Sequence, residues 1–378
     1  MIPTKNVLDI GLYKRASYET DLFESFAARY RWEHYSLATE STIVTLIRSF
    51  FTLKRLSNFD VIVTRDYFSS FGISLRLLVT LCRTKHVTIG LNQSRKLLKT
   101  NLRFIDCAID RIVHRCNRIV VHSRREITLF SELHCIPPTR FVFSLWGFDL
   151  PTITPDKFSK WERPYVCLIG RNNRDIDTFA EALEGMDIDG IVITSNDQQL
   201  PPGLPRNVTV FRELPQNSAL DCILNASANL ILLKDNNRGA GHITTVAAMF
   251  AGTPQVFSDV EVIRDYLIDG VTALGTPLGD GRALRGAINA LFRQPKLKAE
   301  LCHNAKLYAE RWLTHAAALK RTLAVLDGLW DDKLLCSVDH EWLASFEAEK
   351  SNKCARGSDD TGFTIEVGVS EPSDPAGR

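Results

Sequence analysis

The sequence predicts two α/β domains in tandem, each built on a doubly wound parallel sheet. Short apolar runs rich in β-branched residues alternate with helical patterns, and this alternation occurs twice along the chain. Such alternation is typical of parallel sheets, because each parallel connection needs a crossover. The length of 378 residues suits two domains, each large enough to bury its own core. Hydrophobic residues at 45% and charged residues at 24% are the composition of an ordinary globular protein.

The first domain is expected to span residues 1–150. Apolar runs predict its strands at residues 6–12, 60–64, 86–91 and 118–122, and helical patterns separate them, among others at 21–30 and 69–81. A polar stretch that contains prolines follows, and we expect this stretch, residues 151–164, to be the linker between the domains.

The second domain is expected to span residues 165–335. The pattern of short apolar runs restarts there and predicts strands at residues 165–169, 190–194, 208–211, 230–233 and 255–257. A helical pattern covers residues 300–330, and a terminal helix is predicted at 336–350. Few large apolar residues occur in residues 351–378, which predicts a disordered tail.

Net charge differs between the two halves. Residues 1–150 hold 22 Lys and Arg against 13 Asp and Glu, whereas the remainder holds 24 against 31. Within residues 48–118 the basic side chains alternate with apolar ones at helix-like spacing, which suits an anionic membrane surface or a phosphate-bearing acceptor. A solvated face beside a core stripe explains the pattern equally well. No nucleic-acid-binding motif accompanies the charge, so a nucleic-acid partner is not expected.

Cysteines and histidines indicate neither disulfides nor a metal site. The nine cysteines include no CxxC pair, and the nine histidines lack HxxxH and HExxH spacing. No apolar leader with a cleavage site opens the chain, and no apolar run is long enough to span a bilayer. We therefore expect the protein in the cytoplasm, either free or peripheral on the inner face of the membrane.

One stretch, residues 229–254, predicts an anion site. An apolar strand runs into a turn with Gly239 and Gly241, and a helix follows. Backbone N–H groups at a helix start lack intrahelical partners and lie at the positive end of the helix dipole, so they can hold a diphosphate. Glycine lets the backbone take positive φ and lets a phosphate approach closely. The alternative is an ordinary turn of an α/β domain without a ligand.

Four segments of the second half resemble the donor domain of GT-B glycosyltransferases of the group 1, family 4-like type. They are GRNNRDIDTFAEAL (170–183), the glycine turn and its helix (239–252), GTPQV (252–256) and IRDYLIDGVTALGTPLGD (263–280). In the first half, IVVHSRREITLF (119–130) and VFSLWGFDLP (142–151) are similar to segments of the acceptor domain. The resemblance covers roughly residues 60–330 and implies two Rossmann-like domains that face each other across a cleft.

The resemblance also implies an activity. Such enzymes bind a nucleoside-diphosphate sugar on the second domain and transfer its sugar, with retention and without a metal or other cofactor, to an acceptor that enters from the first. A cell-surface polysaccharide or lipid-linked precursor is the expected acceptor. Arg171 matches the family arginine that faces the diphosphate and is the expected catalytic residue. The other expected donor-binding residues are Arg174, Lys234, Gly239, Gly241, His242, Thr244 and Thr245, and the expected acceptor-side residues are Asn92 and Arg95.

The chain departs from the family at two donor-site positions. Relatives commonly carry glutamates where this chain has Gly239 and Ala247. Two alternatives therefore stay open: a catalytically degenerate subunit that binds a partner or the membrane, and a nucleotide-sugar epimerase. The pairs Asp175–Asp177 and Asp187–Asp189 have a spacing that binds metal in other glycosyltransferases, but the first pair suits a helix cap and the second a turn.

Overall fold

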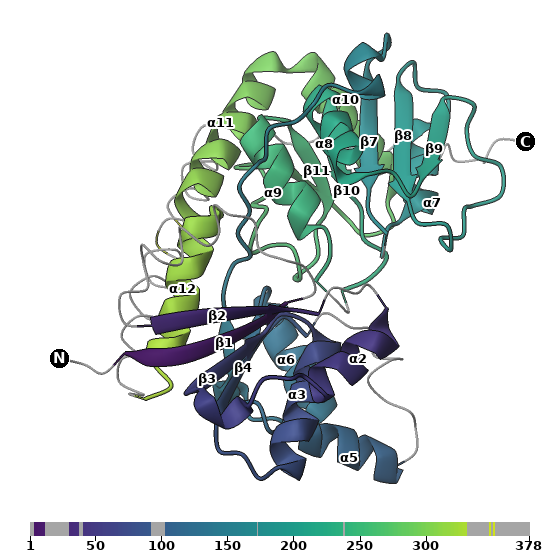
Figure 1. Cartoon of the computed structure of the whole chain (residues 1–378). Coiled ribbons are helices and arrows are strands. Elements are labelled where there is room, and N and C mark those ends of the chain that lie inside the picture. The colour runs from purple at the N-terminus through teal and green to yellow at the C-terminus, as the bar shows by residue number, and fades with distance from the viewer. Residues whose placement is uncertain are drawn as a thin grey trace, which may run out of the picture.

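The computed structural model describes residues 4–11, 30–37, 41–91, 103–171, 173–236 and 239–330, besides Ala348 and Ser351. Two α/β domains follow one another along the chain, each with helices packed around a six-stranded parallel sheet (Figure 1). This confirms the expected pair of doubly wound domains. Asn92, Arg95, most of the expected helix 21–30, and nearly all of the terminal helix 336–350 and the tail 351–378 lie outside the described residues.

The first sheet has the strand order β2-β1-β3-β4-β5-β6 and is parallel throughout. The order reverses between β1 and β3, where Val7 lies opposite Val61. All four predicted strands are present, whereas β2 and β6 were not predicted. The helical pattern 21–30 is wrong at its last residue, because Tyr30 begins β2. The strands are β1 (Lys5–Gly11), β2 (Tyr30–Ser36), β3 (Val61–Thr64), β4 (Lys85–Ile89), β5 (Arg118–Val121) and β6 (Phe141–Phe143).

Four α-helices lie between the strands of this sheet in the described part of the sequence: α2 (Thr42–Phe50), α3 (Tyr67–Val79), α5 (Arg103–Val113) and α6 (Arg124–His134). Local sequence explains where two of them begin. The Asp66 carboxylate caps α3 by accepting a hydrogen bond from the Ser69 amide at 2.9 Å. The helix therefore begins at Tyr67, two residues before its predicted start. Ser123 and Glu126 form a capping box at the start of α6.

The second sheet has the order β12-β11-β10-β7-β8-β9, and its order reverses between β7 and β10. All five predicted strands are present, and the short edge strand β12 was not predicted. The strands are β7 (Tyr165–Ile169), β8 (Asp189–Thr194), β9 (Val208–Arg212), β10 (Ala228–Ile231), β11 (Gln255–Ser258) and β12 (Leu274–Thr276). The helices are α7 (Ile176–Leu183), α8 (Gln216–Asn225), α9 (His242–Ala251), α10 (Gly281–Arg293) and α11 (Pro295–Trp312).

The chain returns to the first domain through α12 (His315–Asp327), which Figure 1 shows beside β1 and β2. The helical pattern 300–330 is two helices rather than one, because Thr314 caps a new helix by accepting from the Ala317 amide at 3.1 Å. Leu319, Leu323 and Leu326 pack into the core of the first sheet. The last helix assigned to the second domain by the sequence therefore packs on the first.

The interdomain stretch 151–164 packs on the second domain. It contains a short 3₁₀ helix, Lys157–Lys160, whose Phe158 is buried in the core beside β7 and α8. The Asp221 carboxylate on α8 accepts hydrogen bonds from the amides of Phe158 and Ser159 at 3.1 and 3.2 Å. The connection is thus anchored rather than loose.

Removing a buried side chain of α12 should destabilise the first domain. Leu326 is fully buried against the first sheet, so we expect Leu326→Ala to lower the free energy of unfolding by about 2–5 kcal/mol. Leu307→Ala on α11 is the matched control, because that residue is 46% exposed whereas Leu326 is fully buried, and its effect should be clearly smaller, at about 0.5 kcal/mol. Urea unfolding followed by circular dichroism measures both. Equal effects would show that α12 does not pack on the first sheet in solution.

Candidate functional site

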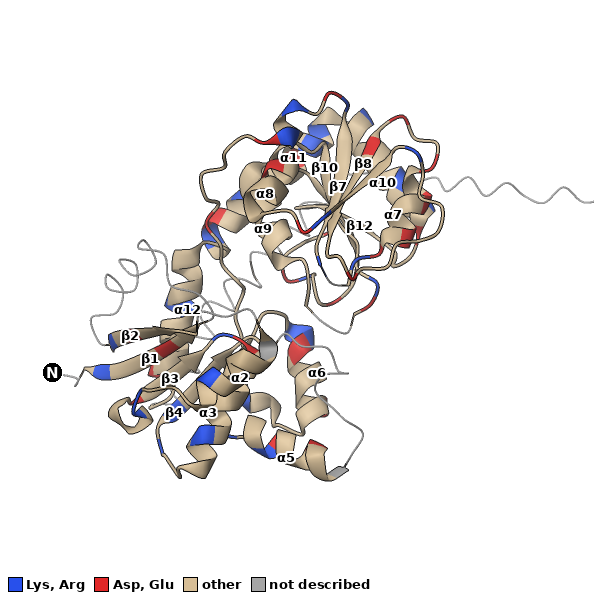
Figure 2. Ribbon diagram, turned by 45° about the vertical axis from the view of Figure 1, so that its right-hand side comes forward, with Lys and Arg blue, Asp and Glu red and all other residues tan. Residues whose placement is uncertain are grey.

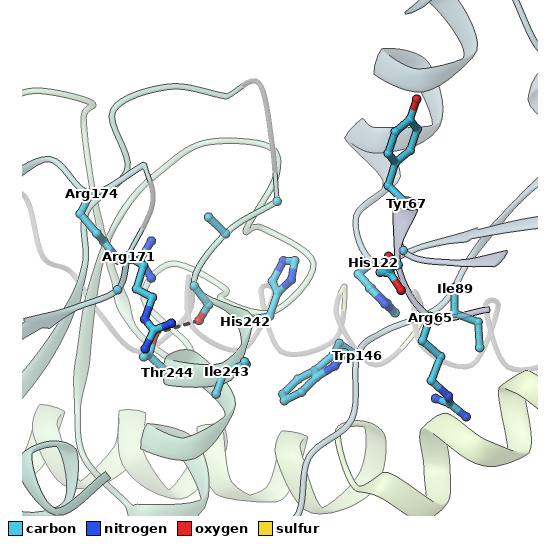
Figure 3. A pocket seen from close by; sticks show the side chains of 16 residues that line it. Arg65, Tyr67, Ile89, His122, Trp146, Arg171, Arg174, His242, Ile243 and Thr244 are labelled. Atoms are coloured by element: carbon cyan, nitrogen blue, oxygen red, sulfur yellow. Dashed lines mark hydrogen bonds between the residues drawn. The ribbon is translucent and has the colours of Figure 1, made fainter. Parts of the chain in front are cut away.

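A cavity of about 550 Å³ lies between the domains, where the carboxyl ends of both sheets face each other. In open α/β sheets ligands bind at this edge, next to the point where the strand order reverses. From the first domain the cavity is lined by residues at the ends of β3, β4 and β5, and from the second by Gly170, Arg171, Arg174 and residues 239–244 (Figure 3). A side cavity of about 200 Å³ shares Arg65, Ile89, His122 and Trp146 and extends to α12.

The predicted glycine turn opens α9 at one wall of this cavity. Gly241 is the N-cap, with φ of +89°, and no side chain caps the helix there. A side chain at Gly241 would be strained, and its Cβ would lie 3.0 Å from Ile231 Cγ2. The Thr244 hydroxyl donates to the Gly241 carbonyl at 3.0 Å. The first amides of α9 therefore stay available to a ligand, at the positive end of the helix dipole.

Two arginines follow β7 and line the same wall. Arg174 is only 4% exposed, and its Nε donates to the Ile169 carbonyl at 2.8 Å. Its guanidinium lies against Gly170 and beside Gly241, where an ideal Cβ would be 3.5 Å from Arg174 Nη2. The Arg171 side chain is 67% exposed and pairs with Glu213 at 3.1 Å. The deeper positive charge at the glycine turn thus belongs to Arg174, although the sequence favoured Arg171.

The structure gathers most, but not all, of the residues that the sequence selected. Arg171, Arg174, Gly239, Gly241, His242 and Thr244 line the cavity. Lys234 and Thr245 are not among the lining residues. The Lys234 ammonium group faces Asp177 at 3.5 Å, and the Thr245 hydroxyl is buried within the domain. A strand-end lysine and a helix-start threonine are therefore near the site without facing it.

His242 is a half-buried, neutral side chain. Its ring stacks on Tyr266 with centroids 4.4 Å apart. Burial lowers the pKa of His242 to about 3, and His122 and Arg174 act in the same direction, while the Val262 backbone opposes them. His242 is consequently uncharged near neutral pH. It adds no positive charge to the wall that Arg174 and the α9 amides form.

Several first-domain residues of the cavity were missed by the sequence analysis. Arg65, Gly90 and His122 each follow an apolar strand directly, and residues in that position reach the carboxyl edge of a parallel sheet. The Arg65 Nε donates to the buried Asp9 carboxylate at 3.0 Å. The signal that could have found them is a polar residue or a glycine at the end of a predicted strand or directly after it, because Gly90 and His122 are near the ends of the predicted strands 86–91 and 118–122.

Glu126 explains the glycine at position 239. One carboxylate oxygen accepts from the amides of His122 and Ser123 at 3.1 and 3.2 Å, and the other accepts from the Gly239 amide at 3.2 Å. A Cβ on Gly239 would lie 2.8 Å from Glu126 Oε1 and 2.9 Å from His242 Cε1. A glutamate at position 239 cannot fit this arrangement. The carboxylate that meets the turn comes instead from the first domain.

Ala247, the other position where relatives have a glutamate, is fully buried. It packs in the core between α9, β7 and α8, together with Cys167 and Ile223. A charged side chain there would be buried without a partner, which is strongly unfavourable.

Further contacts join the start of α6 to the second domain. The Asp265 carboxylate accepts from the Arg124 amide at 3.0 Å, so it caps α6 from the other domain. The Arg125 guanidinium pairs with Glu261 at 3.2 Å. The Tyr266 hydroxyl donates to the His122 carbonyl at 3.0 Å. These contacts hold the two cavity walls in a defined relation.

The four aspartates with metal-binding spacing have structural partners. Asp175 caps α7 by accepting from the Thr178 amide at 3.1 Å, as expected. Asp177 faces Lys234, and Arg163 pairs with both Asp187 and Asp189, at 2.7 and 3.4 Å. Within the described ranges, no three His, Cys, Asp or Glu side chains form a group that could hold a metal ion.

No family model matches this sequence, and no curated protein matches it. Solved structures do match. HepE from Anabaena, in complex with UDP, is 14% identical, with 85% of this chain and 100% of that chain covered and a TM-score of 0.62. Sucrose-phosphate synthase from Thermosynechococcus elongatus is 15% identical, with 86% and 99% covered and a TM-score of 0.64. A glycosyltransferase from Rickettsia africae is 12% identical, with 87% and 99% covered and a TM-score of 0.61. In agreement with its two facing Rossmann-like domains, the chain has the GT-B fold of these proteins.

Proposed function

We propose that this protein is a glycosyltransferase that transfers a sugar from a nucleoside-diphosphate sugar. The supporting observation is that the uncapped start of α9 and the Arg174 guanidinium meet at one wall of the interdomain cavity. Amides at a helix start and a guanidinium together form a strong site for a diphosphate. HepE, which has the same fold, was crystallised with UDP.

Sugar transfer needs stabilisation of the departing diphosphate and exclusion of water from the oxocarbenium-like centre. In the proposed mechanism Arg174 and the α9 amides stabilise the diphosphate, and Arg171 meets it from the exposed side. No metal is required for this, because cationic and dipolar groups supply the positive field. The resemblance to group 1 glycosyltransferases favours retention of configuration, with a hexose as the transferred sugar and a polysaccharide or lipid-linked precursor as the acceptor.

The first domain carries a surface that suits a lipid-linked acceptor. Residues 41–58 and 67–85 contain six Lys and Arg and no Asp or Glu (Figure 2). Large apolar side chains of the same two segments are exposed: Ile43, Ile47, Phe51, Leu53, Val79 and Leu81. The Arg76 guanidinium on α3 donates to the Lys54 carbonyl at 3.2 Å, so the two segments lie together. We name this surface the α2–α3 face.

Exposed apolar side chains beside basic ones match an anionic bilayer, because the apolar groups enter the interface and the cations meet the headgroups. We therefore propose that the α2–α3 face holds the protein at the inner face of the cytoplasmic membrane. None of the helices in the described part of the chain is long and apolar enough to cross a bilayer.

One observation favours a second function. Gly239 and Ala247 leave this chain without the two donor-site glutamates, which suits a GT-B protein that binds a partner or a membrane without catalysing transfer. Such a protein would bind anionic vesicles but release no nucleoside diphosphate from any sugar donor. A nucleotide-sugar epimerase would instead yield an altered sugar without an acceptor.

Removal of Arg174 should weaken nucleotide binding. Screening UDP, GDP and their sugars by thermal unfolding first identifies the ligand, which at a hundred times its Kd should stabilise by about 2.7 kcal/mol. Loss of a charged hydrogen-bonding group costs about 1.5–3 kcal/mol, so Arg174→Ala should lower affinity by roughly 10- to 100-fold.

Two further variants keep this test decisive. Arg171→Ala removes an exposed side chain, so it should abolish transfer and leave the fold intact. Arg163→Ala is the control, because that arginine pairs with Asp187 away from the cavity. Transfer by Arg171→Ala at the unsubstituted rate, or equal nucleotide affinity in Arg174→Ala and Arg163→Ala, would contradict the proposed site.

Substitution in the α2–α3 face should abolish membrane binding. Phe51 and Leu53 are 70% and 93% exposed, so Phe51→Ser with Leu53→Ser should leave the fold unchanged. Binding to phosphatidylglycerol vesicles should fall at least about tenfold, because apolar burial in the interface is lost. The double variant Leu278→Ser with Leu307→Ser, on the second domain, should bind like the unsubstituted protein. Cosedimentation with vesicles measures both, and equal binding would refute the membrane proposal.

A further inference from the structure

Two histidines, one from each domain, lie close together at the cavity (Figure 3). His122 follows β5 in the first domain, and His242 begins α9 in the second. Their ring centroids are 6.5 Å apart, with an interplanar angle of 75°. The two rings are close enough for one sugar to contact both.

The proton of His122 is on Nδ1. This nitrogen lies 2.9 Å from the Ser144 carbonyl oxygen, which can only accept a hydrogen bond. Burial lowers the pKa of His122 to about 4, so the ring is neutral near pH 7 and Nε2 carries a lone pair. An ideal Cβ on Gly90 would lie 3.8 Å from His122 Nε2, so the glycine leaves this nitrogen uncovered on that side.

His242 is also neutral near pH 7, because burial lowers its pKa to about 3. His242 Nε2 is buried and has no hydrogen-bond partner in the structure. A buried polar atom without a partner is unfavourable, which indicates that a ligand supplies the missing partner.

His122 Nε2 is consequently a hydrogen-bond acceptor, and His242 Nε2 is the unpartnered nitrogen of a second neutral ring. Phosphate and carboxylate oxygens only accept, so an anion gains nothing at His122 Nε2. A hydroxyl group both donates and accepts, so it matches His122 Nε2 and can pair with His242 Nε2 in either tautomer. The cavity is thus divided into an anion-binding wall, formed by the α9 amides, Arg171 and Arg174, and a hydroxyl-binding part, formed by His122 and His242.

We propose that His122 Nε2 and His242 Nε2 hydrogen-bond two hydroxyl groups of the donor sugar, with His122 as the acceptor, which makes the preferred donor a neutral hexose rather than a sugar acid. This inference rests on the proposed function, since it places the sugar beside the diphosphate site. It adds a specificity determinant to which both domains contribute.

The test compares Asn and Gln at each position. Asparagine is short, and at position 122 it can keep the hydrogen bond to the Ser144 carbonyl, but at either position it leaves nothing at the place of Nε2. Glutamine is longer and brings an amide oxygen to that place. We expect His242→Asn and His122→Asn to bind UDP within about twofold of the unsubstituted protein and UDP-glucose about three- to tenfold more weakly, as for one lost neutral hydrogen bond. The Gln variants should recover part of that loss.

Titration calorimetry measures these affinities, with GDP and GDP-mannose as the pair if guanine is the preferred base. A second measurement needs no variant: the unsubstituted protein should bind UDP-glucuronic acid at least about tenfold more weakly than UDP-glucose, because a carboxylate cannot donate. If the protein binds no nucleoside diphosphate, the proposed function fails and this inference with it. If it binds UDP, but the Asn variants lose affinity for both ligands equally or for neither, or the glucuronic acid donor binds as well as UDP-glucose, only this inference is wrong.

Discussion

The contact between the start of α6 and the second domain determines the geometry of the candidate site. Glu126 bonds the Gly239 amide, and Asp265 in return caps α6 through the Arg124 amide. Both carboxylates are buried, and each accepts main-chain hydrogen bonds, so their positions vary little. The glycine turn is consequently positioned by its own helix on one side and by the other domain on the other. A change in the domain contact must therefore reach the proposed diphosphate site directly.

Charge and hydrogen-bonding capacity are separated within the cavity. Main-chain amides and the Arg174 guanidinium lie together where an anion fits, whereas two neutral imidazoles lie a short distance away. Burial keeps both histidines neutral, so they do not compete with Arg174 for the anion. The Ser144 carbonyl sets the tautomer of His122, so a main-chain atom decides what this side chain can recognise.

Local patterns predicted the central strands and the glycine turn, because buried parallel strands are continuous apolar runs and the turn needs glycine. The edge strand β2 escaped prediction, since YRWEHYS is largely polar and pairs with one neighbour. The direction of α12 and the role of Glu126 depend on contacts between residues far apart in sequence, 113 positions apart for Glu126 and Gly239. Arg174 lies deeper at the glycine turn than Arg171, and this difference is one of side-chain burial. No periodicity or spacing contains that information.

The return of α12 to the first sheet has a consequence for biosynthesis. The ribosome synthesises the chain from its N-terminus, and domains generally fold as they emerge. Here the sheet made first waits for Leu319, Leu323 and Leu326, which are translated after the entire second domain. Until then its apolar face remains uncovered and exposed to chaperones or to other nascent chains. The final helix therefore couples completion of the early domain to synthesis of the late one.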